Sequence, residues 1–427
     1  MLKTLDLREK YGDYLDYLPR PKATVEPPVD AVREIVERVR LNGDVALREY
    51  TARFDGVDTT EFEISKAEME AGYNRLDPKL RDALELAADA ISGYYQLELH
   101  EDRDYTHNGM VVTQLTIPVN VAGCYVPGGK ARYPSSLLMT AIPARVAGVD
   151  EVILCVPPRS DGTLDDATLA AAHIAHVDHL YRVGGAQAIA AMAYGTKSIK
   201  RADVIVGPGN VYVSQAKREV SGVVGIPTSY AGPSEVVVIA DNTVDADWAM
   251  IDVVVQAEHG PDGLAWLITW DEDLAERAPQ IAEKLLVDSP RQTETLATLS
   301  EGGYVVLVRD FEQAFQVSNA IAPEHLEIMS TEYAKMVPLI KNAGAVFLGP
   351  YSPASVGDYL AGPSHVLPTD GTARFASALS VVDFQKRVHL VTVSKNSMKQ
   401  IAPHLSAIAD AEGLWAHSVS AQIRLEK

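Results

Sequence analysis

Residues 235–260 read EVVVIADNTVDADWAMIDVVVQAEHG, and this stretch decides the fold class. Its first part, EVVVIAD, is a short run of β-branched and apolar residues, which is typical of a strand buried on both faces. Its second part, ADWAMIDVVVQAEHG, has the apolar spacing of a helix that follows the strand. The stretch therefore predicts one β–α unit of a parallel sheet covered by helices.

The same alternation extends in both directions along the chain. Six further segments indicate short buried strands, namely EVILCVPP (151–158), HLYRVGG (179–185), DVIVGPGN (203–210), LAWLITW (264–270), YVVLVRD (304–310) and AVFLGP (345–350). Helical patterns separate most of these segments. Seven strands preceded by a helical region favour two α/β units.

The flanking regions differ in texture. Two amphipathic helices are expected around LNGD (41–44) and a third over residues 78–99, followed by a β-rich stretch from residue 110. The end of the chain has a helical pattern, with a break expected near Pro403.

Composition limits the function classes. The chain has 427 residues and a net charge of −20, with 58 acidic against 38 basic side chains. This balance argues against a partner such as nucleic acid or an anionic membrane, which Lys and Arg would have to neutralise. The start lacks the apolar region of a signal peptide, and no run approaches the roughly eighteen apolar residues of a membrane span. With only two cysteines, we expect a cytoplasmic protein.

Three strand-to-turn junctions contain glycine, namely YVPGGKARYPSS (125–136), RVGGAQAIAA (182–191) and VGPGNVYVSQAKR (206–218). None has the glycine spacing of a dinucleotide fingerprint or of a P-loop. Any one of them is adequately explained as a tight turn. Together, at the carboxyl ends of neighbouring strands, they predict a phosphate-bearing ligand.

The histidine cluster HIAHVDH (173–179) resembles a metal site but is a poor one. The pattern predicts that its helix ends near Val177 and that a strand begins at His179, so the three rings would not converge. No acidic residue orients them. Cys124 and Cys155 lie in apolar strand-like runs without a neighbouring base, so we interpret them as buried structural residues.

Two stretches combine chelating or acid–base groups at helical spacing. Gln256 and His259 are three residues apart, which places both on one face of a helix end. Chemistry alone would instead favour Glu258 with His259 as metal ligands. In APEHLEI (322–328), Glu324 and His325 follow a proline, which predicts a helix start carrying a carboxylate and an imidazole.

Two later stretches add further candidates. SVGDYLAGPSHVLPTDG (355–371) holds Asp358 and His365 in what its glycines and prolines indicate is a long loop. AEGLWAH (411–417) contributes Glu412 and His417 near the end of the chain. Spacing alone does not show that positions so far apart meet in space.

Eight ordered blocks together resemble the histidinol dehydrogenase family over nearly the whole chain. They are VPGGKARYPSSLLMTAIPARVAGV, YRVGGAQAIAAMAYGT, VIVGPGNVYV, AGPSEVVVIAD, QAEHGPD, APEHLEI, GDYLAGPSHVLPT and EGLWAH. The resemblance implies an α/β fold with two Rossmann-like parallel-sheet domains, small N- and C-terminal extensions and an intertwined homodimer. The implied boundaries are an extension over 1–26, a first domain over 27–124 plus 236–378, an inserted domain over 125–235 and an extension over 379–427.

The resemblance also implies a set of site residues. One Zn²⁺ per subunit would be held by Gln256, His259, Asp358 and His417. Glu324 and His325 would be the acid–base pair. The substrate would meet Ser234, Gln256, His259, His325, Asp358, Glu412 and His417, with His365 nearby. NAD⁺ would meet Tyr125, Gln187 and Asn210, one from each glycine loop. Glu412 and His417 are expected to act across the dimer interface.

The activity implied by the resemblance is oxidation of L-histidinol through L-histidinal to L-histidine with two NAD⁺. A paralogue that oxidises another small primary alcohol, such as a sulfonated diol, at the same zinc/NAD site is the alternative. The chain departs from many family members at VGIPTSY (224–230), a longer segment before Ser234 that is expected to reshape the substrate pocket.

Overall fold

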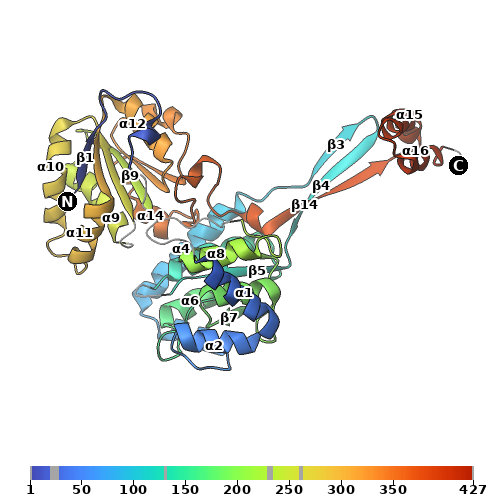
Figure 1. Cartoon of the computed structure of the whole chain (residues 1–427), viewed down its shortest axis with the longest axis horizontal. Helices are drawn as coiled ribbons and strands as arrows, with labels where there is room; N and C mark the ends of the chain where they lie inside the picture. Colours follow the sequence, from blue (N-terminus) through green and yellow to red (C-terminus); the bar gives the residue numbers. More distant parts are fainter. Residues whose placement is uncertain (1, 20–27, 129–131, 228–233, 259–262, 426–427) are drawn as a thin grey trace.

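The computed structural model describes residues 2–19, 28–128, 132–227, 234–258 and 263–425. Two α/β units lie side by side, and a long arm extends away from them (Figure 1). The predicted α/β class with parallel sheets is confirmed. Among the described residues, no helix is both long and apolar enough to cross a membrane.

The first unit is built on a six-stranded parallel sheet in the order β1-β11-β10-β9-β12-β13. Its strands are β1 (Lys3–Asp6), β9 (Glu235–Ala240), β10 (Leu264–Thr269), β11 (Gly303–Leu307), β12 (His325–Met329) and β13 (Ala345–Leu348). The helices of this region are α9 (Ala246–Ala257), α10 (Glu272–Leu285), α11 (Gln292–Gly302), α12 (Phe311–Ile321), α13 (Tyr333–Met336) and α14 (Ala354–Tyr359). Apolar clusters cover both faces of this sheet. The strands are therefore nearly continuous apolar runs, as the sequence predicts.

The second unit contains a five-stranded sheet in the order β2-β7-β6-β5-β8. Its strands are β2 (Glu63–Ile64), β5 (Val121–Tyr125), β6 (Glu151–Cys155), β7 (His179–Tyr181) and β8 (Val204–Val206). All pairs are parallel except β2 with β7. The helices are α1 (Val29–Asn42), α2 (Asp44–Phe54), α3 (Lys66–Arg75), α4 (Pro78–Gln96), α5 (Pro134–Val146), α6 (Asp166–Ile174), α7 (Gly185–Tyr194) and α8 (Val211–Val220).

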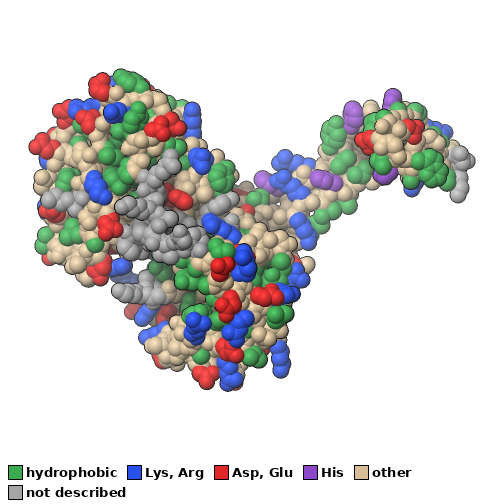
Figure 2. Space-filling view, in the orientation of Figure 1, with side chains coloured by type: hydrophobic (Ala, Val, Ile, Leu, Met, Phe, Trp, Pro, Cys, Tyr) green, Lys and Arg blue, Asp and Glu red, His purple; other side chains and the backbone are tan. Residues whose placement is uncertain are grey.

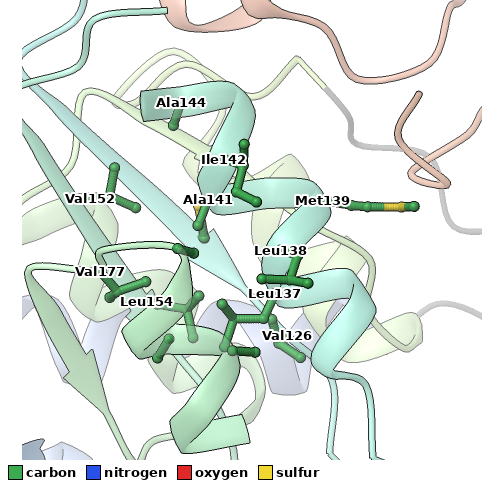
Figure 3. Close-up of a cluster of buried hydrophobic side chains, with 14 of the residues drawn as sticks. Val126, Leu137, Leu138, Met139, Ala141, Ile142, Ala144, Val152, Leu154 and Val177 are labelled. Atoms are coloured by element: carbon green, nitrogen blue, oxygen red, sulfur yellow. The ribbon is translucent and has the colours of Figure 1, made fainter. Parts of the chain in front are cut away.

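The core of the second unit shows how helix patterning becomes packing. Helix α5 lies on β5 and β6, and its Leu137, Leu138 and Ala141 belong to one buried cluster with Val152 and Leu154 (Figure 3). Burying each such side chain contributes about 1.5–3 kcal/mol relative to exposure. This packing fixes α5, whose Ser136 hydrogen-bonds His365 at the candidate site.

The packing differs from the predicted domain partition. Helices α1 and α2 contact α7, α3 contacts α6 and α4 contacts α5, so residues 29–96 lie with the five-stranded sheet rather than with the first unit. Residues 3–6 instead form an edge strand of the six-stranded sheet. Amphipathic spacing reveals that a helix has a buried face, but it does not specify which sheet covers that face.

The arm is a three-stranded antiparallel sheet that ends in a helical hairpin. Its strands are β3 (Arg103–His107), β4 (Met110–Pro118) and β14 (Gln385–Val393), and its helices are α15 (Lys395–Ala411) and α16 (Trp415–Gln422). The predicted break near Pro403 is wrong, because α15 runs through that proline. Hydrophobic side chains gather over the helical tip (Figure 2), where Ile408 and Trp415 are 63% and 74% exposed.

Candidate active site

Glu324 and His325 lie at the amino end of β12, not at a helix start as Pro323 predicts. His325 is the first residue of the strand and Glu324 directly precedes it. The sequence that follows explains the difference, because Leu326 and Ile328 alternate with His325 and Glu327 at the period of a strand. Leu326 and Ile328 join one apolar cluster, whereas His325 and Glu327 face the opposite side, where α9 packs.

The imidazole of His325 lies between two carboxylates. Nδ1 is 3.8 Å from Glu324 Oε2, and Nε2 is 3.7 Å from Asp358 Oδ1. Nδ1 has no hydrogen-bond partner among the described residues. The Phe347 ring stacks against the imidazole at 6.0 Å between ring centres. A buried imidazole that is flanked but not saturated can accept a proton from a bound ligand.

Burial and neighbouring charges tune these groups. Burial raises the pKa of Glu324 to about 7, although the neighbouring His325 opposes the shift. Burial lowers the pKa of His325, but Asp358 and Glu324 outweigh it and bring this pKa above its usual value. Glu235 is a further buried carboxyl whose pKa burial raises to about 8, and its backbone N–H donates to Glu324 Oε2 at 3.1 Å. The cluster thus holds carboxyl groups that titrate near neutral pH.

Asp358 lies on helix α14, whereas the sequence indicates a loop for this region. Close packing fixes the helix, because a Cβ on Gly357 would come within 2.5 Å of the Phe347 ring. His365 follows in irregular chain, and its Nδ1 donates to the Asp358 carbonyl at 3.0 Å. Its Nε2 accepts from Ser136 of α5 at 2.8 Å. His365 therefore ties the Asp358 helix to the second unit.

Gln256 is buried in the last turn of α9, at 2% exposure. Glu258 is the C-terminal cap residue of this helix and is exposed, so the alternative ligand points away from the core. His259 lies outside the described residues. Ala257 and Glu258 line one groove together with Tyr359, which places the ends of α9 and α14 beside each other.

These donors fit a zinc ion that this chain completes only in part. The buried amide oxygen of Gln256 and the carboxylate of Asp358 are oxygen donors that Zn²⁺ accepts. Within the described ranges, however, no group of three or more His, Cys, Asp or Glu side chains is arranged to hold a metal. The predicted set needs His259 and His417 in addition, and neither of them lies in the described part of this cluster.

Glu412 and His417 lie on the arm. Glu412 caps α15 and His417 belongs to α16, and both are exposed. Figure 1 shows α15 and α16 at the far end of the arm, well away from α9 and α14. They share an apolar hollow of about 510 Å³ with Leu405, Ile408 and Leu414. The structure therefore does not bring them to the site of their own chain.

The three glycine loops follow β5, β7 and β8. In the sheet order, β6 and β7 lie on one side of β5 and β8 lies on the other, so the order of strand addition reverses between β5 and β8, although these strands are parallel. Open α/β sheets bind ligands at such a switch point, beyond the carboxyl ends of the strands. Gly207, at φ +106°, leaves no room for a side chain against the Tyr125 carbonyl, so the two loops touch.

The predicted cofactor residues have distinct local roles. The Tyr125 hydroxyl accepts from the Gly185 N–H at 3.0 Å, and Gln187 is buried beside the same glycine. Asn210 caps α8 by accepting from the backbone N–H groups of Tyr212 and Val213. The structure thus gathers Tyr125 and Gln187 at one loop and places Asn210 at the next helix start.

A cavity of about 880 Å³ lies between the two units. The six-stranded unit contributes Ser234, Glu324 and Gly344, and the five-stranded unit contributes Gly207 and Lys217. His365 also lines this cavity. Glu324 and the glycine loop after β8 therefore line one space, although Glu324 precedes strand β12 and the loop follows strand β8. The segment 228–233, which includes most of the atypical turn before Ser234, lies outside the described residues.

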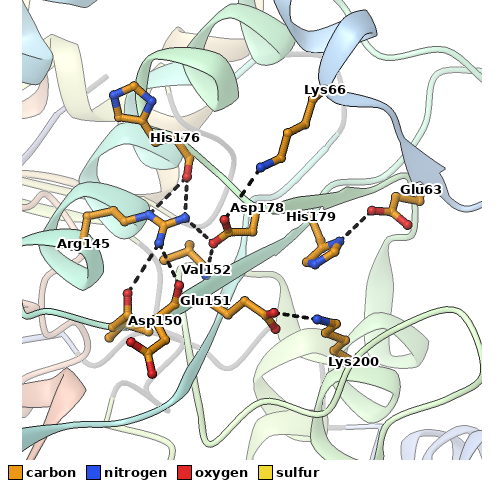
Figure 4. Close-up of polar contacts among 11 residues, drawn as sticks. Glu63, Lys66, Arg145, Asp150, Glu151, Val152, His176, Asp178, His179 and Lys200 are labelled. Carbon is orange, nitrogen blue, oxygen red and sulfur yellow. Dashed lines mark hydrogen bonds and ion pairs between the residues drawn. The ribbon is translucent and has the colours of Figure 1, made fainter.

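The rejected histidine cluster does not converge, as expected. His173 stacks on Tyr73 at 4.9 Å. His176 has φ +52°, and its carbonyl accepts from Arg145. His179 pairs with Glu63 at 2.6 Å, on the other side of the network in Figure 4.

Both cysteines are free and buried, and burial raises the pKa of the Cys124 thiol to about 12.

Sequence reasoning missed several buried polar groups near the site. Asp252, Glu327, Glu235 and Lys217 are all buried. Charged residues are almost never fully buried unless they are paired. A charged residue within an otherwise apolar strand or helix was therefore an available signal.

Two largely parallel sheets, with a buried group of carboxyl and imidazole side chains beside the cavity between them, indicate an α/β enzyme. Comparison with known proteins specifies which one. A family model described as histidinol dehydrogenase matches residues 18–425. The chain belongs to the histidinol dehydrogenase family, which is a family of oxidoreductases.

Individual relatives agree along nearly the whole chain. The histidinol dehydrogenase of Rhizobium meliloti is 43% identical over 97% of this chain and 95% of the relative. That of Gluconobacter oxydans is 46% identical over 93% of each chain. The crystal structure of histidinol dehydrogenase from Elizabethkingia anophelis has a TM-score of 0.94 at 33% identity and covers 100% of this chain and 98% of that chain.

Proposed function

We propose that the protein oxidises L-histidinol to L-histidine in two steps, each using one NAD⁺. The alcohol first loses a hydride to NAD⁺ and a proton to give L-histidinal. The aldehyde then adds water, and the hydrate loses a hydride to the second NAD⁺ and two protons to give the carboxylate. The observation that carries this proposal is the buried His325, whose Nδ1 is unsatisfied and whose ring lies between Glu324 and Asp358. Family membership supplies the substrate class.

The acid–base residues have separate tasks in this proposal. His325 accepts the hydroxyl proton as hydride leaves in the first step. Glu324 removes a proton from the water that adds to the aldehyde, a task suited to a carboxyl whose pKa is about 7. The neighbouring Glu235 N–H holds one Glu324 oxygen in place. A positioned group of this kind contributes about 10²–10⁴-fold in rate.

Two groups beyond the chain complete the chemistry. When bound, NAD⁺ accepts hydride and Zn²⁺ acts as a Lewis acid toward the alcohol oxygen. Gln256, His259, Asp358 and His417 would hold the metal. Tyr125, Gln187 and Asn210 would contact the dinucleotide, at the switch point between β5 and β8. Ser234 and His365 line the shared cavity and would contact the substrate.

Glu412 and His417 are proposed to serve the site of a second copy. Their exposed position on a projecting arm supports this arrangement, as do the apolar residues around them. Beside α9 and α14 lies a groove of about 850 Å³ with apolar lining residues such as Leu84 and Ile91, which such an arm could fill. The Glu412 carboxylate would then neutralise the ammonium group of the amino alcohol. The assembly would be a homodimer. The two buried free thiols of each chain fit a location in the reducing cytoplasm.

NADH stoichiometry tests this function. Metal-replete protein with limiting L-histidinol and excess NAD⁺ is expected to form two NADH per substrate, and chelation of the metal is expected to stop turnover. No NADH from histidinol, together with turnover of a non-amino diol, would assign the protein to a paralogue with another alcohol substrate. The Glu412→Gln variant separates the same alternatives, because it should impair only a substrate that carries an ammonium group.

A further inference from the structure

A buried pair of carboxyl groups joins the elements that carry the candidate site. Asp252 of α9 and Glu327 of β12 are 5% and 1% exposed, and their carboxyl groups hydrogen-bond each other. Glu327 Oε1 also accepts from the backbone N–H of Ala354, the first residue of α14, at 3.2 Å. Apart from each other, Asp252 Oδ2 and Glu327 Oε2 have no hydrogen-bond partner among the described residues.

The pair must share a proton. Ionised carboxylates only accept hydrogen bonds, so two of them bond each other only when one is protonated. Burial, together with the partner carboxyl, raises the pKa of Glu327 well above its usual value, and burial raises that of Asp252 as well. The pair therefore holds at least one proton, and it connects a helix to a strand.

The spacing from this pair to the site residues is short and regular. Gln256 follows Asp252 by four residues on α9, and Asp358 follows Ala354 by four residues on α14. Residues four apart lie one above the other on a helix face. Glu327 follows His325 by two residues on β12, on the same side of the strand. One hydrogen-bonded pair thus sets the relative position of three elements, each of which carries a site residue one turn or one pleat away.

We propose that the Asp252–Glu327 pair is a positioning pair for the metal site, which fixes α9 and α14 against β12 so that Gln256 and Asp358 approach the same ion. This inference rests on the metal site proposed above. Hydrogen bonds behind metal ligands orient them, and their loss typically weakens metal binding about 10–100-fold.

Substitutions at both positions test this role through zinc affinity. Competition with a chelator of known affinity, and the visible spectrum of the Co²⁺-substituted protein, report the site without any turnover. Glu327→Ala is expected to weaken zinc binding at least about tenfold and to alter the Co²⁺ spectrum. Glu327→Gln is expected to bind zinc like the wild type, because the amide donates to Asp252 and accepts from Ala354, as a protonated carboxyl group does. Asp252→Ala, which spares the Glu327–Ala354 bond, gives a second variant if Glu327→Ala does not fold.

Asp241→Ala is a matched control, since Asp241 is also buried and accepts a hydrogen bond from Ser330 at 2.7 Å. These two residues follow the carboxyl ends of β9 and β12, whereas the candidate site lies at the amino end of β12. It is expected to lower the melting temperature and to leave zinc affinity unchanged. The inference is overturned if both alanine variants of the pair bind zinc like the wild type, or if Asp241→Ala weakens binding equally. A wild-type protein that binds no divalent ion would instead refute the metal site, and with it the proposed function.

Discussion

The Nε2 atom of His325 lies 3.7 Å from Oδ1 of Asp358, although the two residues come from a strand and a helix separated by 33 positions in sequence. This distance is too long for a hydrogen bond, yet the carboxylate still favours the protonated imidazole. Asp358 is thus both a candidate metal ligand and a charge partner of the candidate catalytic histidine. In the proposed site, metal binding and proton transfer share this one group, so the predictions for the two parts of the site are linked.

The acid–base pair gives the first prediction. His325→Gln and Glu324→Gln are each expected to lower kcat for NADH formation about 10²–10⁴-fold, because each removes a proton acceptor from the reaction. Initial rates of NADH formation at saturating substrate concentrations measure the loss in kcat. His173→Gln is the control, because this ring stacks on Tyr73 away from the site and its loss should leave kcat unchanged. A His325→Gln protein with wild-type kcat would show that His325 does not move the proton.

The contact between Gly357 and Phe347 gives the second. In Gly357→Ala, the new Cβ would meet the ring within 2.5 Å and push α14, with Asp358, away from β13. Overpacking of this kind costs about 1–3 kcal/mol of unfolding free energy, and kcat should fall as well. Denaturant titration and kinetics measure the two effects.

Gly93→Ala serves as the matched change for this test. A Cβ on Gly93, in helix α4, meets nothing within 4 Å. The alanine should therefore stabilise the protein by about 0.5–1 kcal/mol and leave kcat unaffected. Equal effects of the two substitutions would contradict a specific contact at Gly357.

The arm gives the third prediction. If Glu412 and His417 act in a partner's site, His325→Gln and His417→Ala chains are each inactive alone but complement each other in a mixed dimer. Random assembly makes half of the dimers mixed, each with one intact site, so co-expression should restore about a quarter of the wild-type activity. Purification through two different tags isolates the mixed dimer. Absence of any recovery in that species would mean that His417 acts within its own chain.

Lys217 gives the fourth. Its ammonium group donates to the Gly207 carbonyl, and burial lowers its pKa from 10.5 to about 7. Between these two values the unfolded chain binds more protons at this position than the folded one, so unfolding free energy rises with pH in that window. The unfolding free energy of the wild type should therefore increase relative to that of Lys217→Met as pH rises from about 7 to about 10. The increase is about 1.4 kcal/mol per pH unit at most. Denaturant titrations at several pH values measure the difference between the two proteins. A difference that does not change with pH would mean that Lys217 stays charged in the fold.

Much of the fold could be predicted from local pattern. Short apolar strands such as 235–241 and the helices between them are confirmed, because burial on both faces of a parallel sheet leaves an unmistakable apolar run. The strand that carries His325 was missed for the opposite reason. Its polar residues and the preceding proline mask an alternating pattern of only five positions. The assignment of α1 and α2 to a sheet depends on contacts far apart in sequence, which local periodicity does not encode.

The site was predictable in its chemistry but less so in its assembly. Spacing identified Gln256, Asp358 and the Glu324–His325 pair as candidates, and the resemblance assigned their roles. The structure brings His325, Glu324 and Asp358 together and places Gln256 at a neighbouring helix end. Asp252 and Glu327 escaped notice because their meaning depends on a mutual contact across two elements. Local spacing does not indicate that the chain end leaves the body, and the separate C-terminal extension was implied by the resemblance alone.

The projecting arm has a consequence for the enzyme as a population of molecules. A single chain would hold the acid–base pair and the dinucleotide loops, but Glu412 and His417 would lie away from its own site. The single chain would therefore be inactive. Specific activity should then fall on dilution below the dimer dissociation constant and recover on concentration, with no change in any individual fold. Under these conditions the turnover rate depends on the concentration of the chains as well as on that of the substrate.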